Sequence, residues 1–284
     1  MNDTLNHENN IGAITNLYDP RGLRLEVLER ACPAIFASEP DSCVSANYSF
    51  IPTKPILEAI VADGWVLTGA SNQLKGRGSS ARVKPHGAHL LRFRREDTDI
   101  TASKDGFFEI VLMNSHDRTK RYTLQAGIFR MICTNGLIVG NHALTPTKIT
   151  HYNIRQTQDD LVTGARALAA CSSQLSELMD RLRQRMTTKE EQIAFASKAI
   201  ETRYRGSETS LSAATVLLPR RPEDEGDSLW SVFNRVQENL IVGGMNTGRG
   251  HTRPVVSLFE STMLNVKLWQ QMEALADAPQ LALN

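Results

Sequence analysis

The sequence lacks the features of a membrane-spanning or secreted disulfide-rich protein. It contains no run of 18 apolar residues, which argues against a membrane-spanning helix. Residues 1–10 are polar and show no apolar core of a secretory signal. The 284 residues include four cysteines, Cys32, Cys43, Cys133 and Cys171, none in a C-x-x-C pair and too few for a disulfide scaffold. We therefore expect a cytoplasmic protein with no membrane partner, whose cysteines are buried free thiols.

A strong net charge is missing as well. The formal net charge is +1, so no global field attracts nucleic acid or an anionic membrane, and any such site must be a local patch. Hydrophobic residues make up 41% and charged residues 22% of the chain, a balance that permits a packed core and argues against wholesale disorder. The length is enough for one large domain or two modest ones.

No complete catalytic or metal-binding motif is present. Five of the seven histidines fall between residues 86 and 151: His86, His89, His116, His142 and His151. None of them forms the H-x-x-x-H or H-E-x-x-H spacing of a metal site. Cys133 lies in an apolar string without a catalytic signature, and the glycine-rich stretch 243–250 lacks the phosphate-loop order G-x-x-x-x-G-K-[ST]. We expect no bound metal, no cofactor and no catalytic residue.

The first half of the chain predicts a helix-plus-sheet region. Residues 1–20 are polar and predict a flexible arm, and 21–157 predict the sheet region. Helices are expected over 23–31 and from Thr53, a suitable N-cap, to Gly64. Strands are expected over 65–68, 89–94, 107–113, 122–126 and from 137, which favours an antiparallel sheet. Asn135-Gly136 is the strongest turn dipeptide, and we expect a positive φ at one of its residues.

The second half, 158–284, predicts helices. Leucines from Leu161 to Leu182 recur at helical spacing over one long amphipathic stretch. Thr187-Thr188-Lys189-Glu190 is typical of a capping box, with Ile193, Ala194 and Ile200 expected on the inner face of the following helix. Further helices are expected over 228–240 and 258–275. The fold class is therefore α+β, with a helical C-terminal half that we expect to pack on the sheet as one unit.

Several strings resemble the family of phage/plasmid-like proteins known as DUF932, a domain of unknown function. The strings lie at 48–53, 87–94, 127–137, 229–239 and 265–269, and the resemblance spans about residues 45–272. The most specific part is Phe129-Arg130, followed by Cys133-Thr134-Asn135-Gly136. The resemblance implies an occurrence on plasmids, phages and integrated elements. It implies no activity and supplies no catalytic residue.

The most distinctive charge pattern is a basic segment between Leu74 and Arg95 that contains no acidic residue. Its cations are Lys75, Arg77, Arg82, Lys84, Arg92, Arg94 and Arg95. A period-two alternation puts Leu91 and Phe93 on one face of a strand and Arg92 and Arg94 on the other. A basic loop beside a basic strand face suits phosphate neutralisation, with Trp65 or Phe93 as candidate stacking residues. The structural alternative is a solvated hairpin.

Three other arginines are candidates for nucleic-acid contacts. Arg130 lies among apolar residues, where it either holds a phosphate or carboxylate ligand or pairs with a buried acid. Arg249 and Arg253 make the stretch 243–253 a second basic loop, for which a helix connector is the alternative function. The sequence-based nucleic-acid site thus comprises Lys75, Arg77, Arg82, Lys84, Arg92, Arg94, Arg130, Arg249 and Arg253.

Three functional hypotheses follow from these observations. The first is a non-enzymatic accessory protein of a mobile element that binds nucleic acid, with single-stranded DNA as the candidate ligand. A homo-oligomer is compatible with this hypothesis. The second is an interaction protein that counters a host defence factor, which would require Trp230, Phe233 and Trp269 to be partly exposed. The third is an enzyme of unknown type.

Overall fold

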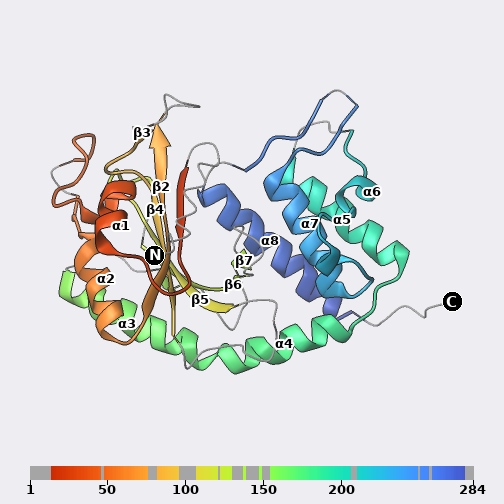
Figure 1. The fold of residues 1–284 in the computed structure, drawn as a ribbon, viewed down its shortest axis with the longest axis horizontal. Coiled ribbons are helices and arrows are strands. Elements are labelled where there is room, and N and C mark those ends of the chain that lie inside the picture. The colour runs from red at the N-terminus through yellow and green to blue at the C-terminus, as the bar shows by residue number, and fades with distance from the viewer. Residues whose placement is uncertain are drawn as a thin grey trace, which may run out of the picture. The chain divides into compact units, whose positions relative to one another are not determined.

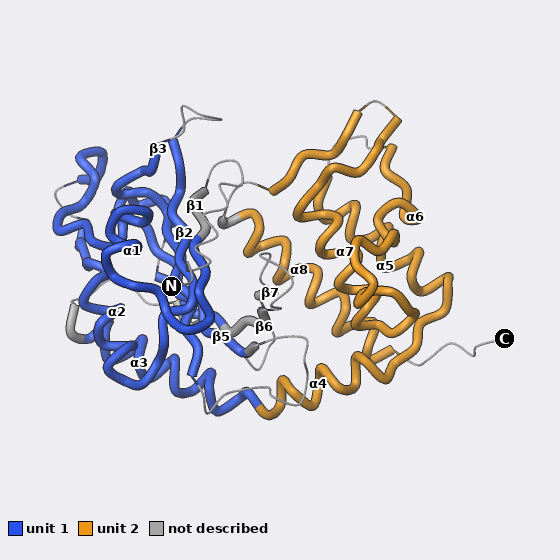
Figure 2. Tube along the Cα trace, in the orientation of Figure 1, with its two compact units in different colours: residues 1–136, 142–172, 256–258 blue, residues 137–141, 173–255, 259–284 orange. Residues whose placement is uncertain are grey.

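The chain forms two compact units in a computed structural model (Figure 2). The structure describes residues 14–45, 48–75, 82–95, 107–120, 122–129, 137–138, 147–148, 154–205, 210–248, 250–255 and 258–278. Unit 1 comprises residues 1–136, 142–172 and 256–258, and unit 2 comprises residues 137–141, 173–255 and 259–284. The α+β class with a helical C-terminal half is confirmed, whereas the packing of residues 158–284 on the sheet stays a prediction.

Unit 1 contains an antiparallel sheet with the strand order β1-β2-β4-β5-β6 (Figure 1). These strands are β1 (Ile14–Tyr18), β2 (Val66–Lys75), β4 (His89–Arg94), β5 (Phe107–Asn114) and β6 (Thr123–Phe129). The two-residue strand β3 (Arg82–Val83) pairs with β2, and β8 (Thr147–Lys148) pairs with β6. The short strand β7 (Leu137–Ile138) falls within the residues of unit 2. Strand β1 falls within the stretch predicted as an arm, and Asn135-Gly136 lies outside the described residues.

The apolar core of the sheet contains a set of leucines paired across three strands. Leu91 is the register partner of Leu112, which in turn is the register partner of Leu124, and all three side chains are buried. Burial of such side chains stabilises each by about 1.5–3 kcal/mol relative to exposure. Cross-strand apolar partners of this kind fix the register, because a slip by one residue would turn them to the opposite face.

Helices α1 (Leu25–Ala31), α2 (Thr53–Ala62) and α3 (Ile154–Ala170), with the short 3-10 helix η1 (Pro33–Phe36), complete unit 1. Helix α3 packs on α2 and β6, and the Gln158 amide donates to the carbonyl of Pro55 over 2.9 Å. The prediction that Thr53 is the N-cap of α2 is wrong, because Pro52 takes that position. The buried Thr53 hydroxyl bonds side chains of the sheet instead.

Unit 2 is built from helices around an aromatic core. They are α4 (Ser172–Gln184), α5 (Lys189–Arg203), α6 (Ala213–Val216), α7 (Leu229–Val242) and α8 (Leu258–Ala276), with the 3-10 helix η5 (Pro222–Asp224). Phe233 packs edge-on against Trp269, with ring centroids 6.0 Å apart. The long amphipathic stretch predicted from Leu161 to Leu182 is two helices, because the chain turns at Cys171.

Helix α5 begins one residue later than its sequence suggests. The capping box joins Thr188 to Glu191: the Thr188 side chain accepts from the backbone N–H of Glu191, and the Glu191 side chain accepts from the backbone N–H of Thr188. This start sets the face that packs inward, which carries Phe195 and Ile200. Ile193 and Ala194 are predicted on that face, but Ile193 is 52% exposed and Ala194 is also exposed. Both corrections follow from the angular positions of these residues on the helix. No described helix has the length and apolar character needed to cross a membrane.

Candidate nucleic-acid interface

The two arginines of β4 differ in what they contact. Arg92 is buried, and its Nε donates to Oε2 of the buried Glu109 over 2.6 Å. Its guanidinium also lies 4.6 Å from the ring centroid of Tyr18. Gly69 on β2 is the register partner of both Tyr18 and Arg92. Its lack of a side chain leaves room for the Arg92 side chain, because a Cβ at Gly69 would lie 2.9 Å from Cδ of Arg92. Arg92 is thus neutralised inside the protein, away from any phosphate.

Arg94 and Arg95 are also engaged with the protein. Arg94 donates from Nη2 to the carbonyl of Pro20 over 3.1 Å. Arg95 lies 5.5 Å from the Trp65 ring centroid, and its Nη1 lies 3.7 Å from Oδ2 of Asp63. The basic face predicted for β4 is therefore largely occupied by contacts within unit 1.

Lys75 and Arg82 are the exposed cations among the described residues of the basic segment. They are register partners at the outer end of the β2–β3 ladder, so two like charges lie directly opposite each other. Like charges in this arrangement repel and destabilise the pair. Neither side chain forms an ion pair with another described residue. An anion placed between them would remove the repulsion.

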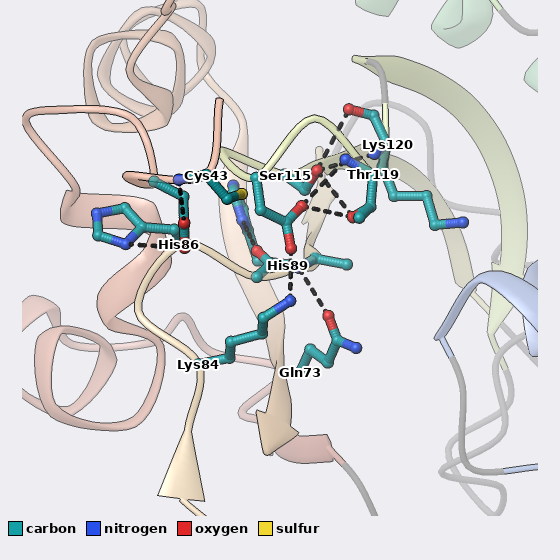
Figure 3. A network of polar contacts seen from close by, with 12 residues as sticks. Cys43, Gln73, Lys84, His86, His89, Ser115, Thr119 and Lys120 are labelled. Carbon is teal, nitrogen blue, oxygen red and sulfur yellow. Dashed lines mark hydrogen bonds and ion pairs between the residues drawn. The ribbon is translucent and has the colours of Figure 1, made fainter. Parts of the chain in front are cut away.

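Lys84, the next cation, joins the hairpin to the turn between β5 and β6. Its Nζ lies 2.6 Å from Oδ2 of Asp117 (Figure 3). Thr119 donates to the other oxygen of that carboxylate from its backbone N–H over 3.1 Å and from its hydroxyl over 2.5 Å. Burial alone would raise the pKa of Asp117, but the hydrogen bonds from Lys84 and Thr119 lower it to about 2. Asp117 is therefore ionised, and its charge is compensated.

The β5–β6 turn carries two cations that the sequence analysis missed. Arg118 is exposed and has a φ of 63°, and Lys120 is half-buried. A positive φ at a residue with a side chain is a strained conformation. Bonds to Ser115 brace the turn, since the Lys120 backbone N–H donates to its Oγ over 2.8 Å (Figure 3).

The strand register places this turn and the β2–β3 hairpin at the same end of the sheet. Asn72 on β2 pairs with His89 on β4, and His89 pairs with Asn114 on β5. Strands β2 and β5 run toward the same end of the sheet, because each is antiparallel to β4, and the chain continues beyond Asn72 and Asn114 at that end. We call the four cations at this end, Lys75, Arg82, Arg118 and Lys120, the basic sheet end. A sequence without its strand register does not show that these residues share one end.

Two half-exposed aromatic rings lie beside the β5–β6 turn. Tyr48 donates from its hydroxyl to the carbonyl of Ser115 over 3.4 Å, and the Phe50 ring lies 4.9 Å from the His116 ring between centroids. Trp65 and Phe93, the stacking residues expected from the sequence, are buried and present no face to a base. The sequence signal for Tyr48 and Phe50 is their Tyr-Ser-Phe string, which the sequence analysis used only for the family resemblance.

A buried polar cluster underlies the basic sheet end. The Thr53 hydroxyl lies 2.8 Å from Nε2 of His89, 3.3 Å from Nε2 of His116 and 3.0 Å from the hydroxyl of Tyr122. Nδ1 of His89 lies 3.0 Å from the carbonyl of Gly87, which makes Nδ1 the donor and leaves Nε2 to accept from Thr53. Burial lowers the pKa of His89 to about 4 and raises that of Tyr122.

This cluster anchors the start of α2 to two strands. Asn114 also donates to the Thr53 hydroxyl, over 3.3 Å. With His89, His116, Tyr122 and Thr53 almost entirely buried, their hydrogen bonds hold the sheet and helix in one arrangement. Buried side chains give a substrate no approach, so we assign the cluster a structural function.

Three of the four cysteines lie among the described residues, and Cys133 lies outside them. Cys32 is buried as predicted, but Cys43 is exposed and Cys171 half-buried, which corrects the expectation of buried thiols. A hydrogen bond to Asp41 raises the pKa of Cys43 and keeps it a thiol. Among the residues that the structure covers, no group of three or more His, Cys, Asp or Glu side chains is placed to bind a metal ion.

The remaining predicted residues are not brought to this site. Arg77, Arg130 and Arg249 lie outside the described residues. Arg253 is exposed and belongs to unit 2. The aromatic residues of the protein-interaction hypothesis, Trp230, Phe233 and Trp269, are buried in unit 2 and form no surface.

Comparisons with known proteins cover nearly the whole chain. The family model described as "Domain of unknown function (DUF932)" matches residues 41–269. The UPF0380 protein YafZ of Escherichia coli (strain K12) is 32% identical over 269 residues, covering 93% of this chain and 95% of the relative. The UPF0380 protein YfjQ of the same organism is 31% identical over the same shares of the two chains. No solved structure matches the chain.

Proposed function

The chain belongs to the DUF932 family, and from that premise we propose that it is a non-enzymatic protein that binds single-stranded nucleic acid with its basic sheet end. The observation that carries the proposal is the cross-strand pair Lys75–Arg82, two exposed cations held opposite each other. Two like charges at this spacing favour a phosphate between them, and phosphate neutralisation dominates nucleic-acid affinity.

The charges around this pair support the same conclusion. Arg118 adds a third exposed cation at the same end of the sheet. Asp117 there is already paired with Lys84. Asp41 accepts a hydrogen bond from the backbone N–H of Cys43 over 2.9 Å, and it lies 3.6 Å from Nδ1 of His86, which carries a charge only when protonated. The carboxylate nearest to the basic sheet end is therefore compensated.

The half-exposed rings of Tyr48 and Phe50 favour single strands over duplexes. Unpaired bases stack on aromatic side chains at about 1–3 kcal/mol per base, with little dependence on sequence. The paired bases of a duplex present no free face to such rings. Contacts of this kind suit an accessory protein of a plasmid, phage or integrated element that handles single strands during transfer or recombination.

A mobility-shift assay with labelled single- and double-stranded DNA and RNA tests the proposal. We expect single strands to bind more tightly, and the affinity to fall steeply between about 50 and 200 mM salt. The variant Phe50→Leu keeps an apolar side chain against His116 but removes the ring, and it should weaken single-strand binding about tenfold. No binding to any of the probes at the lower salt concentration would exclude the function.

A further inference from the structure

Unit 2 has a groove between α5 and α8 with a volume of about 580 Å³. Each helix lines it with one face. From α5 come Ala194, Phe195, Lys198 and Thr202, spaced one, three and four residues apart; Lys267, Gln271, Ala274 and Leu275 of α8 repeat that spacing in part. A groove lined by the faces of two helices has the shape that receives a third helix.

The floor of the groove is apolar and made of small side chains. Ala194 and Ala274 are exposed alanines, and Leu275 is half-buried. Ile193, next to Ala194 and 52% exposed, extends the apolar surface beyond the groove. Alanines on two facing helices let the backbone of a third helix approach closely, while larger apolar side chains fill the space between.

The rim of the groove is positively charged. Lys198, Lys267 and Arg205, just past the end of α5, line it, and none forms an ion pair with another described residue. The one acid of the lining, Glu191, is buried and engaged by Arg185, with Nη2 and Oε1 2.8 Å apart. The accessible charge of the groove is therefore of one sign.

We propose that the α5/α8 groove docks an acidic amphipathic helix of a partner protein. The apolar floor would receive side chains at i, i+3, i+4 and i+7, and the rim cations would pair with carboxylates flanking that stripe. A second copy of this chain does not fit the charge pattern, because a twofold contact would bring the same three cations together. Nucleic acid fits less well, since the one aromatic residue of the lining, Phe195, is buried.

A designed peptide tests the proposal with the full chain. The probe is a labelled helical peptide about five turns long, with Leu and Ala at i, i+3, i+4 and i+7 and Glu on its flanks. Anisotropy should give a dissociation constant on the order of 10 µM or tighter. A scrambled peptide of the same composition should bind at least tenfold more weakly, because its apolar residues no longer share one face.

Charge reversal locates the binding surface. Lys198→Glu with Lys267→Glu should weaken the acidic peptide at least tenfold at low salt, and should strengthen binding of the same peptide with Lys in place of Glu. The control Arg24→Glu with Arg30→Glu changes the net charge equally at two exposed positions of unit 1, and it should leave both affinities unchanged. These surface variants should fold, which circular dichroism checks.

Three outcomes would overturn the proposal. Equal binding of the acidic peptide and its scrambled form would show that no helix is recognised. Displacement of the peptide by single-stranded DNA, with DNA affinity also lost in the Lys198 and Lys267 variant, would assign the groove to nucleic acid. Binding that requires removal of residues 279–284 would make the chain's own terminus the occupant. The first and third outcomes leave the proposed function of the basic sheet end standing.

Discussion

Arg92 and Glu109 form an ion pair between two buried side chains, with Nε and Oε2 2.6 Å apart. The two residues come from adjacent strands, β4 and β5, and Tyr18 of β1 lies against the guanidinium. This contact assigns Arg92 to the interior of the sheet. Loss of nucleic-acid binding in an Arg92 variant would consequently report on folding and say little about phosphate contacts.

Removing one partner of this pair should destabilise the protein strongly. Glu109→Leu leaves a buried guanidinium without its carboxylate, and a loss of about 3–5 kcal/mol in the free energy of unfolding is expected. Arg92→Leu should have a similar effect. The double variant should recover most of the loss, because two apolar side chains need no charged partner. Urea unfolding of the four proteins checks this, and additive losses would contradict it.

Acid should weaken the fold through His89. Because burial lowers its pKa in the folded protein to about 4, against about 6.5 in the unfolded chain, the unfolded state takes up its proton first as the pH falls. The free energy of unfolding should therefore decline between about pH 6.5 and 4, by about 2 kcal/mol between pH 7 and 5. Urea unfolding at the two pH values measures the decline.

The variant His89→Gln supplies the control for this pH dependence. It retains a hydrogen-bonding side chain but has no proton to gain, so its stability should change less between pH 7 and 5. Asp117 does not interfere in this window, since its lowered pKa of about 2 makes its contribution disappear only at lower pH. An unchanged decline in the variant would attribute the effect to other groups.

The double variant Lys75→Ala with Arg82→Ala should reduce the salt dependence of single-strand binding. Each phosphate contact contributes about 0.7 to the slope of log affinity against log salt, so two should flatten it by about 1.4. The melting temperature should stay within a few degrees of the wild type, because the change removes exposed like charges. Arg24→Ala with Arg30→Ala is the matched control, and an equal change of slope there would rule out a local site.

Gly243 and Gly248 offer a matched pair of backbone tests. Both have a positive φ, 70° and 75°, but a Cβ at Gly243 would lie 2.6 Å from the backbone carbon of Arg253, whereas one at Gly248 would meet nothing within 4 Å. Gly248→Ala should cost about 1 kcal/mol of stability. Gly243→Ala should cost about 3 kcal/mol or more. Thermal unfolding compares the two, and equal losses would disprove the close approach.

Sequence patterns predicted the elements whose signal is local. The alternation of β4 and the periodicity of α7 and α8 needed only neighbouring residues, and the predicted bounds differ from the observed ones by two residues or fewer. The partners of polar side chains could not be predicted in this way. Thr53 has the residue type of an N-cap, yet its hydroxyl bonds His89 on a strand 36 residues away in sequence. Such pairing depends on tertiary structure.

In the candidate site, too, features set by neighbouring residues were predicted and features set by tertiary structure were not. Its hairpin cations were found because they are close in sequence, and the structure separates the exposed Lys75 and Arg82 from the engaged Lys84 and Arg92. Arg118 was missed because only the register of β2, β4 and β5 brings its turn to the same end of the sheet.

The late position of α3 in the chain has a consequence during synthesis. Helix α3 packs on β6 but ends at Ala170, 41 residues after β6 ends at Phe129. A ribosome adds about 5–20 residues per second, so α3 follows β6 by about 2–8 s, whereas hairpins form within microseconds. For those seconds the side of β6 that α3 covers is exposed on the nascent chain. More trigger-factor-type chaperone, which covers exposed apolar surface on the nascent chain, should raise the yield of folded protein.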